Sequence, residues 1–348
     1  MNIIEKYKEY SRKKIVIGCI LLIILLLSSI YSLSIGGYKL SLTQIYHSLT
    51  GNGDNATNLI IWNIRLPRIV AAIVAGISLA VSGAVMQCTL RNPLASPYTI
   101  GISYGAMFGA AFAIIFFDVG GAESTGKIFV NSPYVVTVFA FIGALMAVLI
   151  ILLLAKLRRL TPEAMILAGI AIGSLFSAGT MVMQYFANDL QLASMVYWTF
   201  GDLGRPLWVE VGIMTVIMVF SLIYFIYKRW DYNALESGEE SAKSLGVNTE
   251  RTRLWGMLVA SLLVSVNVAF LGIIGFVGLI CPHMVRIFMG GDYRFIIPIS
   301  ALFGAILLLI SDTVARTIIS PIVLPVGILT SFMGAPVFLY LLVKMYKQ

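Results

Sequence analysis

Long apolar stretches, separated by short polar segments, repeat along the whole 348-residue chain. Most of them are long enough to cross the ~30 Å hydrocarbon core of a bilayer as one helix. No polar segment is large enough for a separate soluble domain, so the pattern predicts an all-α integral membrane protein in which residues 1–348 form one membrane domain. The predicted polytopic bundle has about ten transmembrane helices, at about residues 15–35, 69–90, 96–117, 133–155, 163–186, 207–227, 254–272, 275–289, 295–315 and 325–343.

Glycine and proline mark where these spans break and where they pack. The spans at 254–272 and 275–289 are separated by little more than "GIIG", and the second is short and contains Pro282. A tight outer hairpin and a re-entrant segment both fit this pattern. Small residues recur within the spans, as in "AGISLAVSGAV", "ILAGIAIGSLFSAG" and "ALFGAILLL". They predict helices that approach one another closely in a compact bundle.

The composition agrees with a membrane protein, because 59% of the residues are hydrophobic and only 11% are charged. The net charge of +8 does not indicate nucleic-acid binding, since the basic residues fall at the ends of apolar runs. The first apolar run is too long for a signal peptide and lacks an A-x-A cleavage pattern, so we interpret it as a retained span after a cytoplasmic segment at residues 1–14.

The distribution of lysine and arginine predicts the orientation of the bundle in the membrane. An even number of spans places both termini on one side, and cytoplasmic loops are the ones rich in Lys and Arg. If both termini are cytoplasmic, only six of the 24 lysines and arginines face outward: Lys39, Arg65, Arg68, Lys127, Arg205 and Arg316. The sequence therefore predicts two cytoplasmic termini and a multi-pass protein of the cell membrane.

Cysteine and histidine usage does not indicate a metal site. Cys19, Cys88 and Cys281 lie far apart in the sequence, and the two histidines are His47 and His283. Neither a CxxC pattern nor a disulfide framework is present, so we expect no metal held by protein ligands.

The stretch "GAESTGKI" at residues 121–128 is close to the phosphate-binding pattern G-x-x-x-x-G-K-[ST]. Ile128 replaces the hydroxyl that would bind magnesium, and the predicted topology places the stretch outside the cell. We interpret it as a coincidental loop. If transport uses ATP, hydrolysis is then expected in another chain.

The stretch "LRNPLASPYTIGISYGA" joins the second and third spans. Its two prolines keep the backbone out of a continuous helix, and Asn92 can bond the freed backbone groups. Read from the residues alone, it is either a structural turn or irregular backbone that lines a translocation path.

Two further polar features lie within apolar spans. His283, beside a proline in "GFVGLICPHMVR", is expected to be a structural hydrogen-bonding group rather than a ligand. Asp312 and Arg316 share one helix face near the outer end of a span, where an i,i+4 pair lowers the cost of each charge. A local ion pair and a functional pair are both open interpretations.

Several linked motifs in a fixed order resemble those of the FecCD family. They are "RLPR", "GISLAVSGAVMQ", "RNPLASP", "IGISYGA", "SGEESAKSLG", "GFVGLICPHMVR" and "LPVGILTSFMGAPVF", and the resemblance runs from about Ser28 to Val343. This family comprises permease subunits of ABC importers for iron-siderophores, haem and vitamin B12. The pathway or structural positions in these motifs are Arg91, Asn92, Pro93, Pro97, Pro282, His283, Pro325, Gly327, Gly334 and Pro336.

The resemblance implies ten membrane helices with both termini cytoplasmic, in agreement with the charge pattern. It also implies that a second permease copy, identical or paralogous, forms the pathway with this chain. Two ABC ATPase subunits would hold ATP and Mg, so no cofactor is expected on this chain itself. An extracytoplasmic substrate-binding protein would deliver the cargo.

The resemblance assigns Arg65, Arg68 and Arg316 to docking of the binding protein through its acidic residues. Arginine forks bind carboxylates bidentately, and charges at a rim set orientation and association rate. The alternative is that two arginines at a helix mouth contact lipid headgroups.

The longest cytoplasmic segment, residues 230–253, is expected to contain short helical pieces broken at Gly238 and Gly246. It resembles the coupling helices that sit in a groove of the ATPase, and a solvated linker is the alternative. Ser237 stands where the family pattern usually has leucine. The expected coupling positions are Glu236, Gly238, Glu239, Ala242, Leu245 and Gly246.

The sequence analysis therefore predicts the permease subunit of an ATP-driven importer for an iron(III)-siderophore-type chelate, with no covalent chemistry in this chain. Cobalamin and haem are alternative cargoes within the family. An ion-coupled secondary transporter would need a midplane carboxylate or a pair of unwound helices as an ion site, and the acidic residues lie in loops or near helix ends. A membrane enzyme would need a nucleophile, metal cluster or acid–base pair, and none is visible in the sequence.

Overall fold

The computed structural model describes residues 3–122, 128–130 and 132–345 of the chain, and these are almost entirely helical. Two short antiparallel strands, β1 (Gly120–Ala122) and β2 (Ile128–Val130), pair with Gly120 opposite Val130. The helices are α1 (Ile3–Ser34), α2 (Leu42–Leu49), α3 (Asn55–Leu59), the wide π turn η1 (Ile60–Arg65), α4 (Leu66–Thr89), α5 (Ile102–Phe116), α6 (Pro133–Lys156), α7 (Pro162–Phe186), α8 (Asp189–Thr199), α9 (Trp208–Tyr227), α10 (Arg229–Glu236), α11 (Glu239–Ser244), α12 (Thr249–Leu271), α13 (Val277–Met289), α14 (Tyr293–Thr317) and α15 (Val326–Met345).

The predicted apolar spans all appear as helices in the described part of the chain. Seven helices there are long and apolar enough to cross a membrane, with α3, η1 and α4 counted as one continuous span. Three shorter apolar helices, α5, α13 and α15, account for the other predicted spans. Because α1 begins at Ile3, residues 3–14 are helical and continuous with the first span; their cytoplasmic location stays a prediction.

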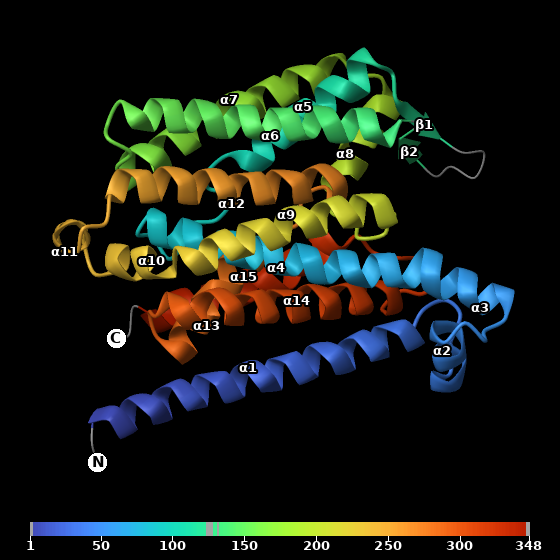
Figure 1. The fold of residues 1–348 in the computed structure, drawn as a ribbon. Coiled ribbons are helices and arrows are strands. Elements are labelled where there is room, and N and C mark those ends of the chain that lie inside the picture. Colours follow the sequence, from blue (N-terminus) through green and yellow to red (C-terminus); the bar gives the residue numbers. More distant parts are fainter. Residues whose placement is uncertain (1–2, 123–127, 131, 346–348) are drawn as a thin grey trace.

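The helices run lengthwise between two ends of the bundle, which differ in the short elements they carry (Figure 1). One end carries α10 and α11 together with the first residues of α1 and the last of α15, and we call it the α11 end. The other end carries α2, α3 and the β1–β2 pair, and we call it the α2 end. Both ends of the described chain lie at one end of the bundle, as an even number of crossings requires; the side of the membrane that this end faces stays a prediction.

Helix α4 forms the centre of the bundle, and α1 lies at its edge (Figure 1). In the most apolar part of the span that contains α4, 83% of the residues are buried, compared with 11% in α1. Glycines make the close contacts possible. A Cβ on Gly76 would lie 2.3 Å from the carbonyl oxygen of Gly304 in α14, and a Cβ on Gly83 would lie 1.7 Å from that of Gly278 in α13. The predicted small-residue packing is confirmed at these positions.

Residues 230–253 form short helical pieces, as expected. Helix α10 ends at Glu236, Gly238 adopts a positive φ of 124°, and α11 ends shortly before Gly246, whose φ is 80°. Glycine tolerates these left-handed conformations, so each break falls where the sequence allows it. The next helix, α12, begins at Thr249, which is earlier than predicted. The phosphate-loop-like stretch at 121–128 lies largely outside the described residues, since 123–127 are not among them.

The short segment at 275–289 is neither a simple hairpin nor a re-entrant loop. Helix α12 ends at Leu271 near the α2 end, and the chain then runs without helix to Val277. Gly278 packs against Leu79 and Gly83 in α4, so α13 starts deep within the bundle. At ~1.5 Å per residue α13 is too short to span a bilayer alone. The non-helical stretch 272–276 completes the crossing.

Candidate functional site: a hollow at two broken crossings and two charged ends

Two non-helical segments, 91–101 and 272–276, meet inside the bundle. The last residue of segment 91–101 lies against α7, because a Cβ on Gly101 would be 3.2 Å from the carbonyl oxygen of Gly169. The second lies against the first, because a Cβ on Gly275 would be 3.5 Å from the ring of Tyr98. Gly101 has a φ of 82° and starts α5 directly after the break. Irregular backbone at this depth is tolerated only against protein or a water-filled cavity.

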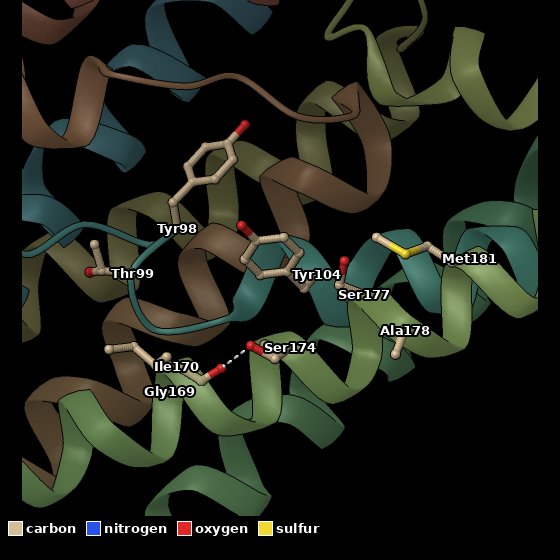
Figure 2. A pocket seen from close by; sticks show the side chains of 10 residues that line it. Tyr98, Thr99, Tyr104, Gly169, Ile170, Ser174, Ser177, Ala178 and Met181 are labelled. Carbon is tan, nitrogen blue, oxygen red and sulfur yellow. Dashed lines mark hydrogen bonds between the residues drawn. The ribbon is translucent and has the colours of Figure 1, made fainter.

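A hollow of about 450 Å³ lies beside this meeting point, between the start of α5 and one face of α7 (Figure 2). Figure 2 shows Tyr98, Tyr104 and Ser177 around it, with Met181 further along α7. Ser174 donates a hydrogen bond of 2.9 Å to the carbonyl oxygen of Ile170. None of the ten described lining residues is charged: Tyr98, Thr99, Tyr104, Gly169, Ile170, Gly173, Ser174, Ser177, Ala178 and Met181. The hollow therefore offers hydroxyls and aromatic faces.

Phe276 connects the broken segment 272–276 to α15. Its φ of 67° lies in the left-handed region, which a bulky residue rarely adopts. Its ring fills the space beside Gly334, where a Cβ would lie 2.4 Å from the ring. Near the α2 end, the Gly327 N–H donates to the Gly201 carbonyl oxygen at 3.2 Å. Gly327 and Gly334, two of the predicted pathway positions, thus hold α15 close to the broken crossing.

At the α2 end, two of the three predicted docking arginines, Arg68 and Arg316, lie in one ion-pair cluster. The carboxylate of Asp312, fully buried in α14, accepts from Arg68 Nε at 2.8 Å and from Arg316 Nε at 2.9 Å. Arg68 Nη2 lies 3.4 Å from the carboxylate of Asp202. The predicted i,i+4 pair of Asp312 and Arg316 is confirmed, and it also includes an arginine from α4. We call these four residues, together with Arg65, the arginine rim.

Arg65 and Arg316 also tie the end of α1 to this rim. Arg65 is 5% exposed and donates to the carbonyl oxygens of Leu33 and Tyr38. Arg316 donates to the carbonyl oxygen of Ile35 at 3.0 Å and to Ser32 Oγ at 2.6 Å. Hydrogen bonds of this kind satisfy donors that would be costly to bury alone. The rim arginines therefore join α1, α4 and α14 at the α2 end.

At the α11 end, two glutamates connect the short helices to the bundle. Glu236 at the end of α10 pairs with Arg286 of α13, and Arg286 donates to the Tyr293 hydroxyl at 2.7 Å. Glu239 at the start of α11 pairs with Arg253 of α12 at 3.0 Å.

The pKa of Glu239 lies below its ordinary value, because Lys243 and then Arg253 donate hydrogen bonds to the carboxylate. Glu239 therefore keeps its charge and its contacts at neutral pH.

The other predicted coupling positions have distinct surroundings. Ala242 is fully buried and anchors α11, whereas Leu245 is 71% exposed and projects from the surface. An exposed leucine beside an anchored helix is available to a partner.

The remaining predicted pathway residues fall on the broken segments or inside helices. Arg91, with a φ of 46°, donates to the carbonyl oxygen of Leu235 at 3.2 Å and so ties the first broken segment to α10. The side chain of Asn92 accepts from the Leu94 N–H at 2.9 Å. His283 is 8% exposed, and its Nδ1 has no hydrogen-bond partner. Pro93 and Pro97 lie in the first broken segment, Pro325 directly precedes α15, and Pro282 and Pro336 lie inside α13 and α15.

Sequence reasoning missed two groups of site residues. Asp202 stands in the loop before α9, and its approach to Arg68 depends on tertiary packing. Tyr98 and Tyr104 were part of a motif, but no periodicity indicates that they face one hollow. The pair of prolines before them was the available signal, because it predicted irregular backbone at this point.

Comparisons with known proteins identify the family of the chain. The model of the FecCD transport family matches residues 22–344. An ABC transporter permease protein of Methanocaldococcus jannaschii is 74% identical over 100% of both chains. The hemin transport system permease of Yersinia pestis is 36% identical over 94% of this chain and 95% of its own. The vitamin B12 import system permease of Vibrio cholerae is 36% identical over 82% of this chain and 83% of its own.

A solved structure has the same fold. It is an inward-facing metal-chelate type ABC transporter, with a TM-score of 0.83 and 32% identity over 94% of this chain and 99% of that one. Permeases of this kind are not enzymes, because a separate ATPase subunit hydrolyses ATP. This chain belongs to the FecCD transport family and is a multi-pass permease subunit of an ABC importer in the cytoplasmic membrane.

Proposed function

We propose that this permease moves an iron(III)-siderophore-type chelate through the hollow beside Tyr98, with cobalamin or haem as the alternative cargo. The observation that carries this proposal is the chemistry of the hollow, which is lined by hydroxyls and aromatic faces and by no charged side chain. A bare ferric ion would call for anionic oxygen ligands. A metal wrapped in an organic shell presents polar and apolar groups that match this lining.

The names of similar proteins support the same cargo class. They refer to hemin, to vitamin B12 and to a metal chelate. In each of these a metal ion is held by a large organic ligand. Hydroxyls and tyrosine rings that contact the shell would bind weakly enough for release, which a transport pathway requires.

The hollow opens on the surface of α7, where Ile170 and Met181 are 58% and 63% exposed. One chain therefore supplies one wall, and a second permease copy, identical or paralogous, would close the pathway. An exposed apolar face of this kind is typical of an interface within a membrane bundle. No cofactor is expected on this chain, and ATP and Mg would be held by the two partner ATPases.

We assign the α11 end to the cytoplasm, where the ATPases would contact the segment 230–253. The arginine rim would then face outward and receive the acidic lobes of the binding protein. Helix α11 is anchored by Ala242 and Glu239, while Leu245 stays exposed. A displacement of α11 would therefore be transmitted to α12 through the pair of Glu239 and Arg253. ATP-driven closure of the ATPases would in this way change access to the hollow.

A secondary transporter is disfavoured although two crossings are broken. Broken helices often form ion sites in such transporters, where carbonyl groups and carboxylates bind the ion. The segments 91–101 and 272–276 contain no aspartate or glutamate. The chain belongs to the FecCD transport family, in which a separate ATPase, rather than an ion gradient, drives transport.

Uptake into proteoliposomes tests the proposal. The permease is reconstituted with its ATPases and binding protein, and ferric hydroxamate, ferric catecholate, haem and cobalamin are offered separately. We expect ATP-dependent accumulation of a ferric chelate only. Accumulation of haem or cobalamin alone would contradict the proposed iron(III) cargo but would still fit an ABC importer. Ion-driven uptake without ATP would contradict the assignment as an ABC importer.

A further inference from the structure

Arg68 holds an incomplete set of partners. Its Nε donates to Asp312 at 2.8 Å, but its Nη2 is buried and has no hydrogen-bond acceptor. The carboxylate of Asp202 lies 3.4 Å from Nη2, which is an ion-pair distance and longer than a charge-assisted hydrogen bond. Among the described rim residues, Arg68 and Arg316 share Asp312, while Arg65 donates to carbonyl oxygens, so three arginines are present with two aspartates and the rim has a net charge of +1. This arrangement attracts a further carboxylate.

Asp202 is the loosest member of the rim. Its side chain is 26% exposed, compared with 0% for that of Asp312. It does not depend on Arg68, because its Oδ1 accepts from the N–H of Gly204 at 2.8 Å within its own turn. The turn also lies tightly over the arginine, since a Cβ on Gly204 would be 2.6 Å from Arg68 Nη1. Access to the Arg68 fork from outside therefore requires this turn to move.

The loop at residues 200–206 is bonded to three helices, α8, α12 and α15, and lies next to the start of the broken segment 272–276. The Asp202 N–H donates to the carbonyl oxygen of Leu271, the last residue of α12, at 2.9 Å. The Gly201 carbonyl oxygen accepts from Gly327 in α15. Arg205 donates to the carbonyl oxygens of Trp198 and Phe200 and so caps α8. Movement of this loop would act on α8, α12 and α15 together.

We propose that Asp202 is an internal stand-in for a carboxylate of the docking partner, and that exchange of one for the other at Arg68 signals docking. In the undocked permease Asp202 occupies the open side of the fork. A partner carboxylate displaces it by forming the bidentate pair that Asp202 does not form, and the freed loop then pulls on α12 and α15. This inference rests on the proposed docking of an acidic binding protein at the rim, and adds a competitor and a trigger to it.

The test uses the permease assembled with its ATPases in nanodiscs, the binding protein, and three variants. Asp202→Asn removes the competing charge but keeps the oxygen that accepts from Gly204. Asp189→Asn is the matched control, because it removes an exposed charge at the same end, at the start of α8. Arg68→Glu tests docking itself. Binding affinity and the ATPase rate without binding protein are measured for each.

We expect Asp202→Asn to bind the partner about tenfold more tightly, equivalent to ~1.4 kcal/mol, and to raise the partner-free ATPase rate severalfold. Asp189→Asn should change neither by more than about twofold, and Arg68→Glu should abolish binding. If Asp202→Asn leaves the affinity for the binding protein unchanged or lowers it while Arg68→Glu abolishes binding, Asp202 is not a stand-in. The proposal that the binding protein docks at the rim then still holds. If Arg68→Glu also binds normally, the docking proposal fails with it.

A second measurement needs no binding protein. Phenylglyoxal modifies accessible arginines, and peptide mass spectrometry reports its attachment to Arg68. Asp202→Asn should speed this modification several-fold over wild type and over Asp189→Asn. Equal rates in all three would show that Asp202 does not shield the fork, and would overturn the inference even if the variant assembled poorly with the ATPases.

Discussion

The arginine rim and the α11 end both rely on ion pairs, but the two clusters differ in burial and in what they connect. At the rim, the fully buried Asp312 bridges α4 and α14. At the α11 end, the carboxylates of Glu236 and Glu239 are 33% and 34% exposed, and they join short helices to the bundle. Buried charges are strongly destabilising when a partner is lost, whereas exposed ones regain water. The rim is therefore part of the architecture. At the α11 end the two glutamates can regain water, but the buried Arg253 cannot, so the Glu239–Arg253 pair is the costly contact to break there.

This difference predicts where the bundle is rigid and where it responds. A binding protein that docked at the rim would meet Arg68 and Arg316 already held by Asp312, with the Asp202 turn as the part to displace, which favours oriented association. An ATPase that contacts α11 would meet a small element with one buried anchor, Ala242, and two ion pairs of Glu239. The pair with Lys243 is exposed, and the pair with Arg253 ties α11 to a buried charge of α12. Force applied there would be transmitted through α12 to the broken crossing.

The largest expected effect is that of Asp312→Ala. It leaves Arg68 and Arg316 without their shared carboxylate, so we expect a loss of about 3–5 kcal/mol of stability. Thermal unfolding of the purified permease, followed by size-exclusion chromatography after heating, measures this loss. The control is Asp189→Asn at the same end, which should unfold like wild type. If the Asp312→Ala permease unfolds at the same temperature as wild type, Asp312 does not hold α4 and α14 together.

A smaller loss is expected in the packed middle that connects the two ends. In Gly83→Ala the new Cβ would overlap the carbonyl oxygen of Gly278, so α4 and α13 must separate. Overpacking of this kind costs about 1–3 kcal/mol. Gly212→Ala is the matched control, because nothing lies within 4 Å of a Cβ there. Equal melting temperatures for the two variants would contradict the close contact.

Glu239→Gln removes the counter-charge of the buried Arg253 but keeps an amide oxygen as its acceptor, so we expect a loss of about 1–2 kcal/mol of stability and a larger effect on transport. The variant weakens the link between α11 and Arg253, so ATP hydrolysis should continue while uptake per ATP falls severalfold. Glu240→Gln, the exposed neighbour, serves as control. Parallel measurement of uptake and ATPase rate in proteoliposomes separates the two, and an unchanged ratio for Glu239→Gln would argue against coupling through this pair.

The smallest effect is the response of the same pair to pH. Because the pKa of Glu239 is lowered, its contribution to anchoring is complete above the ordinary carboxyl value of 4.5 and is lost only as the pH falls through the lower value. Hydrogen exchange of residues 239–244 should therefore keep the same protection from pH 7 to 5, after correction for intrinsic rates. A loss of protection within that range would contradict the paired state.

The sequence predicted the helices of this fold well, because long apolar runs and small-residue motifs report directly on span and packing. It also predicted the breaks at Gly238 and Gly246, where only glycine tolerates the backbone. It did not predict that residues 272–276 cross half the bundle without helix, since these apolar residues have the same composition as a span. The pairing of Arg68 with both Asp202 and Asp312 was also hidden, because it depends on how distant helices pack.

The hollow beside Tyr98 is the proposed route of the cargo, and a cysteine blocked by chemical modification tests this route directly. In a permease whose exposed Cys19 is replaced by serine, Ser174→Cys is modified with a bulky maleimide before uptake is measured in proteoliposomes. Leu175→Cys, on the neighbouring exposed position of α7, is the control because it does not line the hollow. We predict that modification at 174 abolishes ATP-driven uptake, that bound cargo protects 174, and that modification at 175 has little effect. Full uptake by the modified Ser174→Cys permease would contradict the proposed route.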